Sequence, residues 1–109
     1  MNEVKVGSYT GTAATIQISL GFVPTYVRIW NETDGNESWE WFDGMPAGSA
    51  LYSKNHASEQ FAKILANGVS EFAGTEAGVA KGFAVGTAIS ADAKTFRYLA
   101  LRAGPGAQV

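Results

Sequence analysis

The residues best suited to chemistry in this sequence are a single histidine and a group of carboxylates. His56 is the only histidine among 109 residues, and it lies in a polar stretch with Ser53 and Ser58. A histidine base needs a nucleophile and an orienting carboxylate around it in space, and closeness along the chain does not supply that arrangement. The sequence therefore favours a solvated loop or capping role for His56.

The carboxylates Asp34, Glu37, Glu40 and Asp43 follow one another around a predicted hairpin. Paired carboxylates can cleave glycosides or bind a hard cation. However, acidic residues on a hairpin are usually solvated, and the spacing of a calcium-binding loop is absent. We expect neither a catalytic residue nor a metal site in this group.

Other catalytic signatures are missing from the chain. The sequence contains no Gly-x-Ser-x-Gly, His-Glu-x-x-His or phosphate-loop pattern, and no cysteine that could form a disulfide or a thiolate metal site. Gly82 and Gly86 have no predicted helix after them, so they do not form a dinucleotide-binding turn. We therefore expect a protein that is not an enzyme and needs no cofactor.

Three tryptophans, Trp30, Trp39 and Trp41, leave three interpretations open. They can fill the core, form a subunit interface, or offer a platform to a glycan. Tryptophan and tyrosine are enriched among the residues that dominate binding energies, and Phe42 and Tyr52 are close to this group in the sequence. The candidate interface residues are accordingly Trp30, Trp39, Trp41, Phe42 and Tyr52.

Composition narrows the class of protein further. Charged residues make up 17% of the chain, below the usual quarter or so, and the net charge is −2. Eight scattered Lys and Arg residues do not form the basic footprint that nucleic-acid binding requires. No stretch has the features of a signal peptide or the length of a membrane span. We expect no nucleic-acid partner and no membrane partner.

Alternating apolar residues predict strands over much of the chain. Residues 4–9 alternate weakly, as in an edge strand, and residues 14–20 place Ile16, Ile18 and Leu20 on one face. Residues 25–32 have bulk on both faces, which is typical of a central strand. Asp34-Gly35 predicts a hairpin to residues 38–43, across which Trp30 could meet Trp39 or Trp41.

The second half is less uniform. Residues 54–68 fit either a helix or strands, and we favour two short strands joined by a hairpin turn at Asn67-Gly68, because the flanking patterns are β. Residues 80–89 and 95–102 predict two further strands, and residues 103–109 a flexible tail. The expected fold is all-β: one domain, residues 1–109, forming an antiparallel, jelly-roll-like β-sandwich.

Two segments also resemble a known class. "ISLGFVPTYVRIWN" and "GFAVGTAISADAKTFRYLALR" are similar to small virion structural proteins of tailed bacteriophages, which combine a Gly-Phe-x-Pro corner with a Gly-Phe-x-Val-Gly strand and an aromatic last strand. The residues that carry the second part of this resemblance are Gly82, Phe83, Val85, Gly86, Phe96, Tyr98 and Ala100.

The resemblance implies a non-enzymatic capsid decoration, or cement, protein on the virion surface. It implies a homotrimer that binds the major capsid protein and stabilises the head shell after synthesis in the host bacterial cytoplasm. The alternative is a tail-fibre module that binds a receptor or a glycan, because the same motif occurs in such modules.

Overall fold

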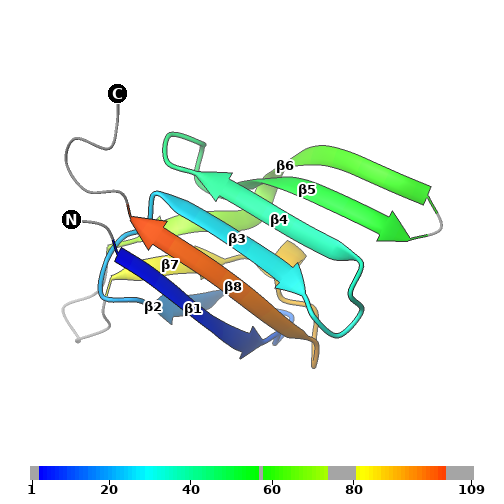
Figure 1. The fold of residues 1–109 in the computed structure, drawn as a ribbon, viewed down its shortest axis with the longest axis horizontal. Coiled ribbons are helices and arrows are strands. Elements are labelled where there is room, and N and C mark those ends of the chain that lie inside the picture. The colour runs from blue at the N-terminus through cyan, green and yellow to red at the C-terminus, as the bar shows by residue number, and fades with distance from the viewer. Residues whose placement is uncertain (1–2, 57, 74–80, 103–109) are drawn as a thin grey trace.

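A computed structural model describes residues 3–56, 58–73 and 81–102 (Figure 1). The predicted tail, residues 103–109, lies outside these ranges. The elements in chain order are β1 (Glu3–Thr10), β2 (Ile16–Ser19), β3 (Tyr26–Asn31), β4 (Glu37–Phe42), β5 (Ser49–His56), β6 (Ser58–Phe72), β7 (Gly82–Val85), the 3-10 helix η1 (Thr87–Ile89) and β8 (Thr95–Arg102). The all-β prediction is confirmed.

The strands form one eight-stranded sheet in the order β1-β8-β3-β4-β5-β6-β7-β2, and every neighbouring pair is antiparallel. The sheet curls, so that β7 and β2 lie behind a front layer of β1, β8, β3, β4 and β5 (Figure 1). This half-barrel is compatible with the predicted sandwich-like domain. Its two layers belong to one continuous sheet because β6 takes part in both.

The corner of the sheet lies within β6. The register with β5 jumps from Ala50↔Ile64 to Ser49↔Val69, so β6 bulges between the two pairs. Asn67 has φ 62°, and the Gly68 N–H donates to the Gly48 carbonyl at 2.8 Å. The strand prediction for this segment is confirmed over helix, but the predicted hairpin turn is wrong. Asn-Gly supplies a left-handed residue to a bulge here, because the strand continues past it.

The core lies between the layers and follows the alternation of each strand. Val27 and Ile29 of β3 are fully buried, and β8 contributes Phe96 and Ala100 from the same side of the sheet. The remaining buried apolar residues are Ile18, Leu20, Phe22, Trp39, Trp41, Ala50, Val69, Phe83, Val85 and Ile89. The predicted common face of Ile16, Ile18 and Leu20 is therefore correct.

Two glycines of the quoted motif permit close backbone contacts. A Cβ on Gly82 would lie 1.8 Å from the Ile18 carbonyl oxygen, and one on Gly86 would lie 2.5 Å from the Cα of Asn67. No side chain fits at either distance. Gly82 therefore allows β7 to pack on β2, and Gly86 allows the end of β7 to pack against the β6 bulge.

The β3–β4 hairpin predicted from Asp34-Gly35 is confirmed, with the Gly35 N–H donating to the Asn31 carbonyl at 2.8 Å. The expected tryptophan pair across this hairpin is wrong. Trp30 lies opposite Ser38, whereas Trp39 lies opposite Ile29. Trp30 and Trp39 therefore point to opposite faces of the sheet, because successive residues of a strand alternate in direction.

Candidate interaction surface

The face of the front layer that points away from the core is rich in apolar side chains. The register aligns them in rows: Val4, Leu101, Tyr26 and Phe42 form one row, and Val6, Leu99, Arg28, Glu40 and Leu51 form the next. A third row runs from Arg97 through Trp30, Ser38 and Ser53 to Phe61. We call the side chains of these three rows the outward face.

Several apolar residues of the outward face are open to solvent. Val6 is 71% exposed and Phe61 is 77% exposed, and Val4, Trp30, Phe42 and Leu51 are also exposed. Scattered exposed apolar residues are normal, but contiguous patches of them are characteristic of interaction sites. Here the strand register places Val4, Leu101, Tyr26 and Phe42 side by side across β1, β8, β3 and β4. Glu40 separates Leu51 from the residues of β3, and Ser38 and Ser53 separate Phe61 from Trp30.

A paired polar cluster occupies the centre of the outward face. The Arg28 guanidinium lies 4.9 Å from the centre of the Trp30 ring, and its Nη1 is 3.9 Å from Glu40 Oε2. The Tyr26 hydroxyl donates to the same carboxylate oxygen at 2.7 Å. Burial, followed by this hydrogen bond, raises the pKa of Tyr26. The charges in this cluster therefore have partners within the face.

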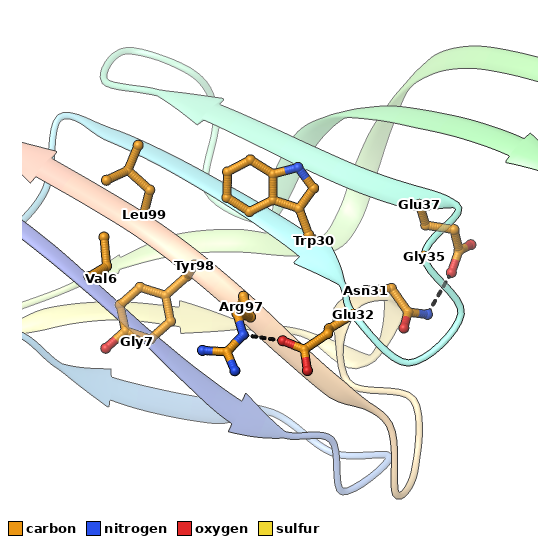
Figure 2. Close-up of a pocket in the computed structure, with 10 residues that line it drawn as sticks. All are labelled: Val6, Gly7, Trp30, Asn31, Glu32, Gly35, Glu37, Arg97, Tyr98 and Leu99. Atoms are coloured by element: carbon orange, nitrogen blue, oxygen red, sulfur yellow. Dashed lines mark hydrogen bonds and ion pairs between the residues drawn. The ribbon is translucent and has the colours of Figure 1, made fainter.

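Trp30 separates two concave regions of this surface. Figure 2 shows Val6, Leu99 and Trp30 around the larger one, with the Arg97–Glu32 ion pair at its rim. Its volume is about 710 Å³. A smaller one of about 300 Å³ is lined by Trp30 together with Ser38, Ser53, Lys54 and Phe61. Trp30 therefore presents its ring between two grooves.

The predicted interface residues fall into two groups. Trp30 and Phe42 lie on the outward face and are 38% and 45% exposed. Trp39 and Trp41 are buried at 3% and 2%, so the core interpretation holds for both of them. Tyr52 is half-buried, with its ring centre 5.5 Å from that of Trp39. The interface role itself stays a prediction, and only Trp30 and Phe42 are well placed for it.

The sequence alone does not assign to this surface six of its apolar residues: Val4, Val6, Leu51, Phe61, Leu99 and Leu101. The alternation within residues 4–9 and 95–102 did place the β1 and β8 members on a common side of their own strands. The sequence does not show the strand order, which brings β1 beside β8 and β8 beside β3 and so joins these residues in one surface.

Three of the four carboxylates of the hairpin, Asp34, Glu37 and Glu40, form hydrogen bonds or ion pairs with neighbouring side chains. Asn31, which is buried, donates from Nδ2 to Asp34 Oδ2 at 2.8 Å and to Glu37 Oε1 at 3.1 Å. Lys94 pairs with Asp34 at 3.0 Å, and Tyr52 donates to Glu37 Oε2 at 2.6 Å. Glu40 belongs to the cluster on the outward face described above, and Asp43 is exposed.

Within the described ranges, no three His, Cys, Asp or Glu side chains come together as metal ligands. His56 is the last residue of β5, and its side chain lies outside what the structure describes. The expected loop or capping position of His56 is therefore wrong, because the residue belongs to a strand, and its expected solvation stays a prediction.

The chain has no match among known protein families, curated proteins or solved structures. In the part of the chain that the structure describes, no helix is long and apolar enough to cross a membrane.

Proposed function

We propose that this protein is a non-enzymatic assembly protein whose outward face is covered by other protein. The observation that supports this proposal is the set of exposed apolar side chains on the outward face, which surrounds the Arg28–Glu40 cluster and includes Trp30. Arg28, Tyr26 and Trp30 occupy alternate positions of β3. These three residue types are the ones most enriched among the dominant contacts of protein interfaces.

The dimensions of the molecule suit this role. It is a thin slab with extents of 42 × 35 × 22 Å, and Figure 1 looks at its broad side. A standard interface buries about 800 Å² per partner, so the broad side is large enough to hold one. Covering apolar area stabilises an assembly by roughly 25 cal/mol per Å² before the costs of association.

The setting we propose is the virion of a tailed bacteriophage, as a capsid decoration or cement protein. Its partners are further copies of itself, in a homotrimer, and the major capsid protein. This setting rests on the two segments that resemble such proteins. Part of that motif, Gly82 and Gly86, has a structural reason in the close contacts of β7, so these residues identify a fold requirement rather than a binding site.

The test measures association directly. The purified chain is analysed by size-exclusion chromatography with light scattering, and then sedimented with capsid shells that lack decoration proteins. We expect an oligomer in the first measurement and saturable co-sedimentation in the second. Trp30→Glu places a charge in the centre of the outward face and is expected to abolish both.

The matched control is Gln17→Glu, an equally charged change at an exposed position of β2 in the back layer. It is expected to leave both measurements unchanged. A chain that stays monomeric and never sediments with shells contradicts the proposal, as does a Trp30→Glu variant that behaves like the original chain.

A second function has one specific observation in its favour. Trp30 exposes its ring beside a groove lined by Ser38, Ser53 and Lys54, and such a ring with neighbouring polar groups is a suitable platform for a sugar. On this alternative, the protein is a tail-associated glycan-binding module. Because Trp39 and Trp41 are buried, quenching of tryptophan fluorescence by host polysaccharide is expected to depend on Trp30 alone. Saturable quenching that vanishes in Trp30→Ala favours the glycan; no quenching favours the protein interface.

A further inference from the structure

The first strand of the chain forms one open edge of the sheet. β1 pairs with β8 along its whole length, from Glu3↔Arg102 to Thr10↔Thr95, and it has no strand on its other side among the described residues. An unpaired strand edge offers a row of N–H and C=O groups to another extended chain. The question is which residues supply that row and which side chains accompany it.

The alternation of backbone hydrogen bonds along β1 shows which of its N–H and C=O groups point to the open edge. Gly11 directly follows β1, and its N–H donates to the Lys94 carbonyl at 2.8 Å. On the other side of β8, Glu32 directly follows β3, and its N–H donates to the Thr95 carbonyl at 2.9 Å. In an antiparallel pair, the residues that exchange hydrogen bonds alternate with those that do not. Both contacts therefore direct the backbone groups of residues 3, 5, 7 and 9 toward β8.

The backbone groups of the intervening residues, Val4, Val6, Ser8 and Thr10, consequently point away from β8 to the open edge. The side chains of Val4 and Val6 belong to the outward face and are 63% and 71% exposed. An added strand would therefore gain backbone hydrogen bonds from these residues. It would also extend the apolar rows of the outward face by one strand.

The charge of Lys5, on the face of β1 opposite to Val4 and Val6, favours some partner strands over others. Lys5 is exposed, and among the described residues it has no ionic partner, whereas Glu3 is paired with Arg102. A lysine on an edge strand opposes pairing with an identical edge, because the second copy brings its own ammonium group to the same side. It favours a strand that carries a carboxylate opposite it.

From these features we propose that β1 is a strand-addition site for an extended segment of a partner protein. The segment has an acidic residue opposite Lys5 and apolar residues opposite Val4 and Val6. Backbone pairing supplies most of the contact, and the alternating side chains supply the selectivity. This inference rests on the proposed assembly function and deepens it, since it specifies a chain segment through which the partner is held.

The experiment uses short capped peptides that end in Val-Glu-Val or Val-Lys-Val, titrated into the ¹⁵N-labelled chain at low salt. We expect the acidic peptide to bind about fivefold more tightly, the combined effect of one attractive and one repulsive cross-strand pair. The amides of Val4, Val6, Ser8 and Thr10 are expected to gain protection from hydrogen exchange. The amides at positions 5, 7 and 9 are already bonded to β8 and change little.

Two substitutions at Lys5 test the charge, and one at Val6 tests the backbone. Lys5→Glu should reverse the order of the two peptides, and Lys5→Gln should make them equal while binding persists. Val6→Pro removes one outward-pointing N–H without removing a hydrogen bond to β8, and it should weaken both peptides more than tenfold. The fold of each variant is checked by its unchanged circular dichroism spectrum and its amide shifts outside β1.

Absence of peptide binding overturns the inference, as does a peptide preference that Lys5→Glu leaves unchanged or protection that appears elsewhere in the sheet. These results are separable from the test of the proposed function. Shell binding that is retained without peptide binding overturns strand addition alone. Peptide binding by a chain that never sediments with shells supports strand addition and overturns the virion setting.

Discussion

Trp30 and Trp39 lie on the same hairpin and have opposite environments. Trp39 is buried beside Phe96 and Tyr52, with ring centres 6.0 and 5.5 Å away, whereas Trp30 is stacked on Arg28 at the surface. The cause is the alternation of side chains along each strand. Trp39 lies opposite Ile29, which faces the back layer, whereas Trp30 lies opposite Ser38, which belongs to the outward face. Residue type alone therefore does not indicate whether an aromatic residue stabilises the fold or is available to a partner.

The same contrast extends over the whole front layer. Its inward side is covered by β2, β7 and the second half of β6, while no described element covers its outward side. The two sides are nevertheless similarly rich in large apolar groups. Substitutions on the inward side should therefore change folding, and those on the outward side should change association.

The largest expected effect comes from truncating the buried member of this pair. Trp39→Ala is expected to lower the free energy of unfolding by about 3–5 kcal/mol, because it leaves a cavity in the core. Trp30→Ala should cost about 1 kcal/mol or less, mainly through the lost contact with Arg28. Urea denaturation followed by circular dichroism measures both, and equal losses for the two variants would contradict the assignment of faces.

The next largest effect concerns Asn31, whose amide joins Asp34 to Glu37. Asn31→Asp places a third carboxylate in this buried position, and we expect a loss of about 3 kcal/mol at pH 7. The pKa of the new carboxyl is raised, so the lost stability should partly return at pH 4, where that group is protonated. Asn36→Asp, on the same loop, is the control and should change the denaturation midpoint little at either pH.

A smaller effect is expected at alkaline pH, where tyrosines on the inward side of the front layer should change the free energy of unfolding more than those on its outward side. Burial raises the pKa of Tyr9 well above its ordinary value of 10.0, and its hydroxyl donates to the Ile89 carbonyl at 2.8 Å. The pKa of Tyr52 is also raised, by burial and then by its hydrogen bond to Glu37.

Above about pH 10 the unfolded chain loses tyrosine protons that the folded chain retains, so the free energy of unfolding should fall as pH rises. It should be constant with respect to these groups below about pH 9. The slope is at most about 1.4 kcal/mol per pH unit for each such tyrosine. Tyr9→Phe should flatten this dependence more than Tyr26→Phe, whose hydroxyl lies on the outward face; a slope unaffected by Tyr9→Phe would contradict the prediction.

The smallest effect is expected for the substitution Trp41→Phe. Its Nε1 is buried and has no hydrogen-bond partner among the described residues. Trp41→Phe removes this unpaired donor along with part of the ring, and the two changes oppose one another. We expect a loss of about 1 kcal/mol or less, against about 3–5 kcal/mol for Trp41→Ala. Thermal unfolding of both variants measures the difference, and a similar loss in each would show that the indole N–H is paired.

The sequence predicted the local elements well because alternation is a property of each strand by itself. Ile16, Ile18 and Leu20, or Val27 and Ile29, define a buried side whatever lies across from it. The hairpin turn predicted at Asn67-Gly68 is wrong because the same dipeptide also suits a β-bulge. Only the position of Gly86, which directly follows β7 and packs against Asn67, decides between them.

The candidate surface could be predicted only in part. A strand pattern shows that Trp30 and Val27 face opposite ways, but it does not show which side the rest of the chain will cover. Val6 and Leu99 join Trp30 in one surface only because the last strand lies between the first and the third. That arrangement depends on pairings between residues almost a whole chain length apart.

The position of β8 also determines when this protein can fold. β8 comes last among the strands of the described residues, yet it lies between β1 and β3 and pairs with both. During synthesis β1 cannot complete its pairing with β8 until Arg102, which pairs with Glu3, has left the ribosome. The front layer can therefore close only after translation has passed its final strand, and loop closure over such a distance makes the search slow. Throughout that interval, the nascent chain exposes Val4 and Val6 on an unpaired segment.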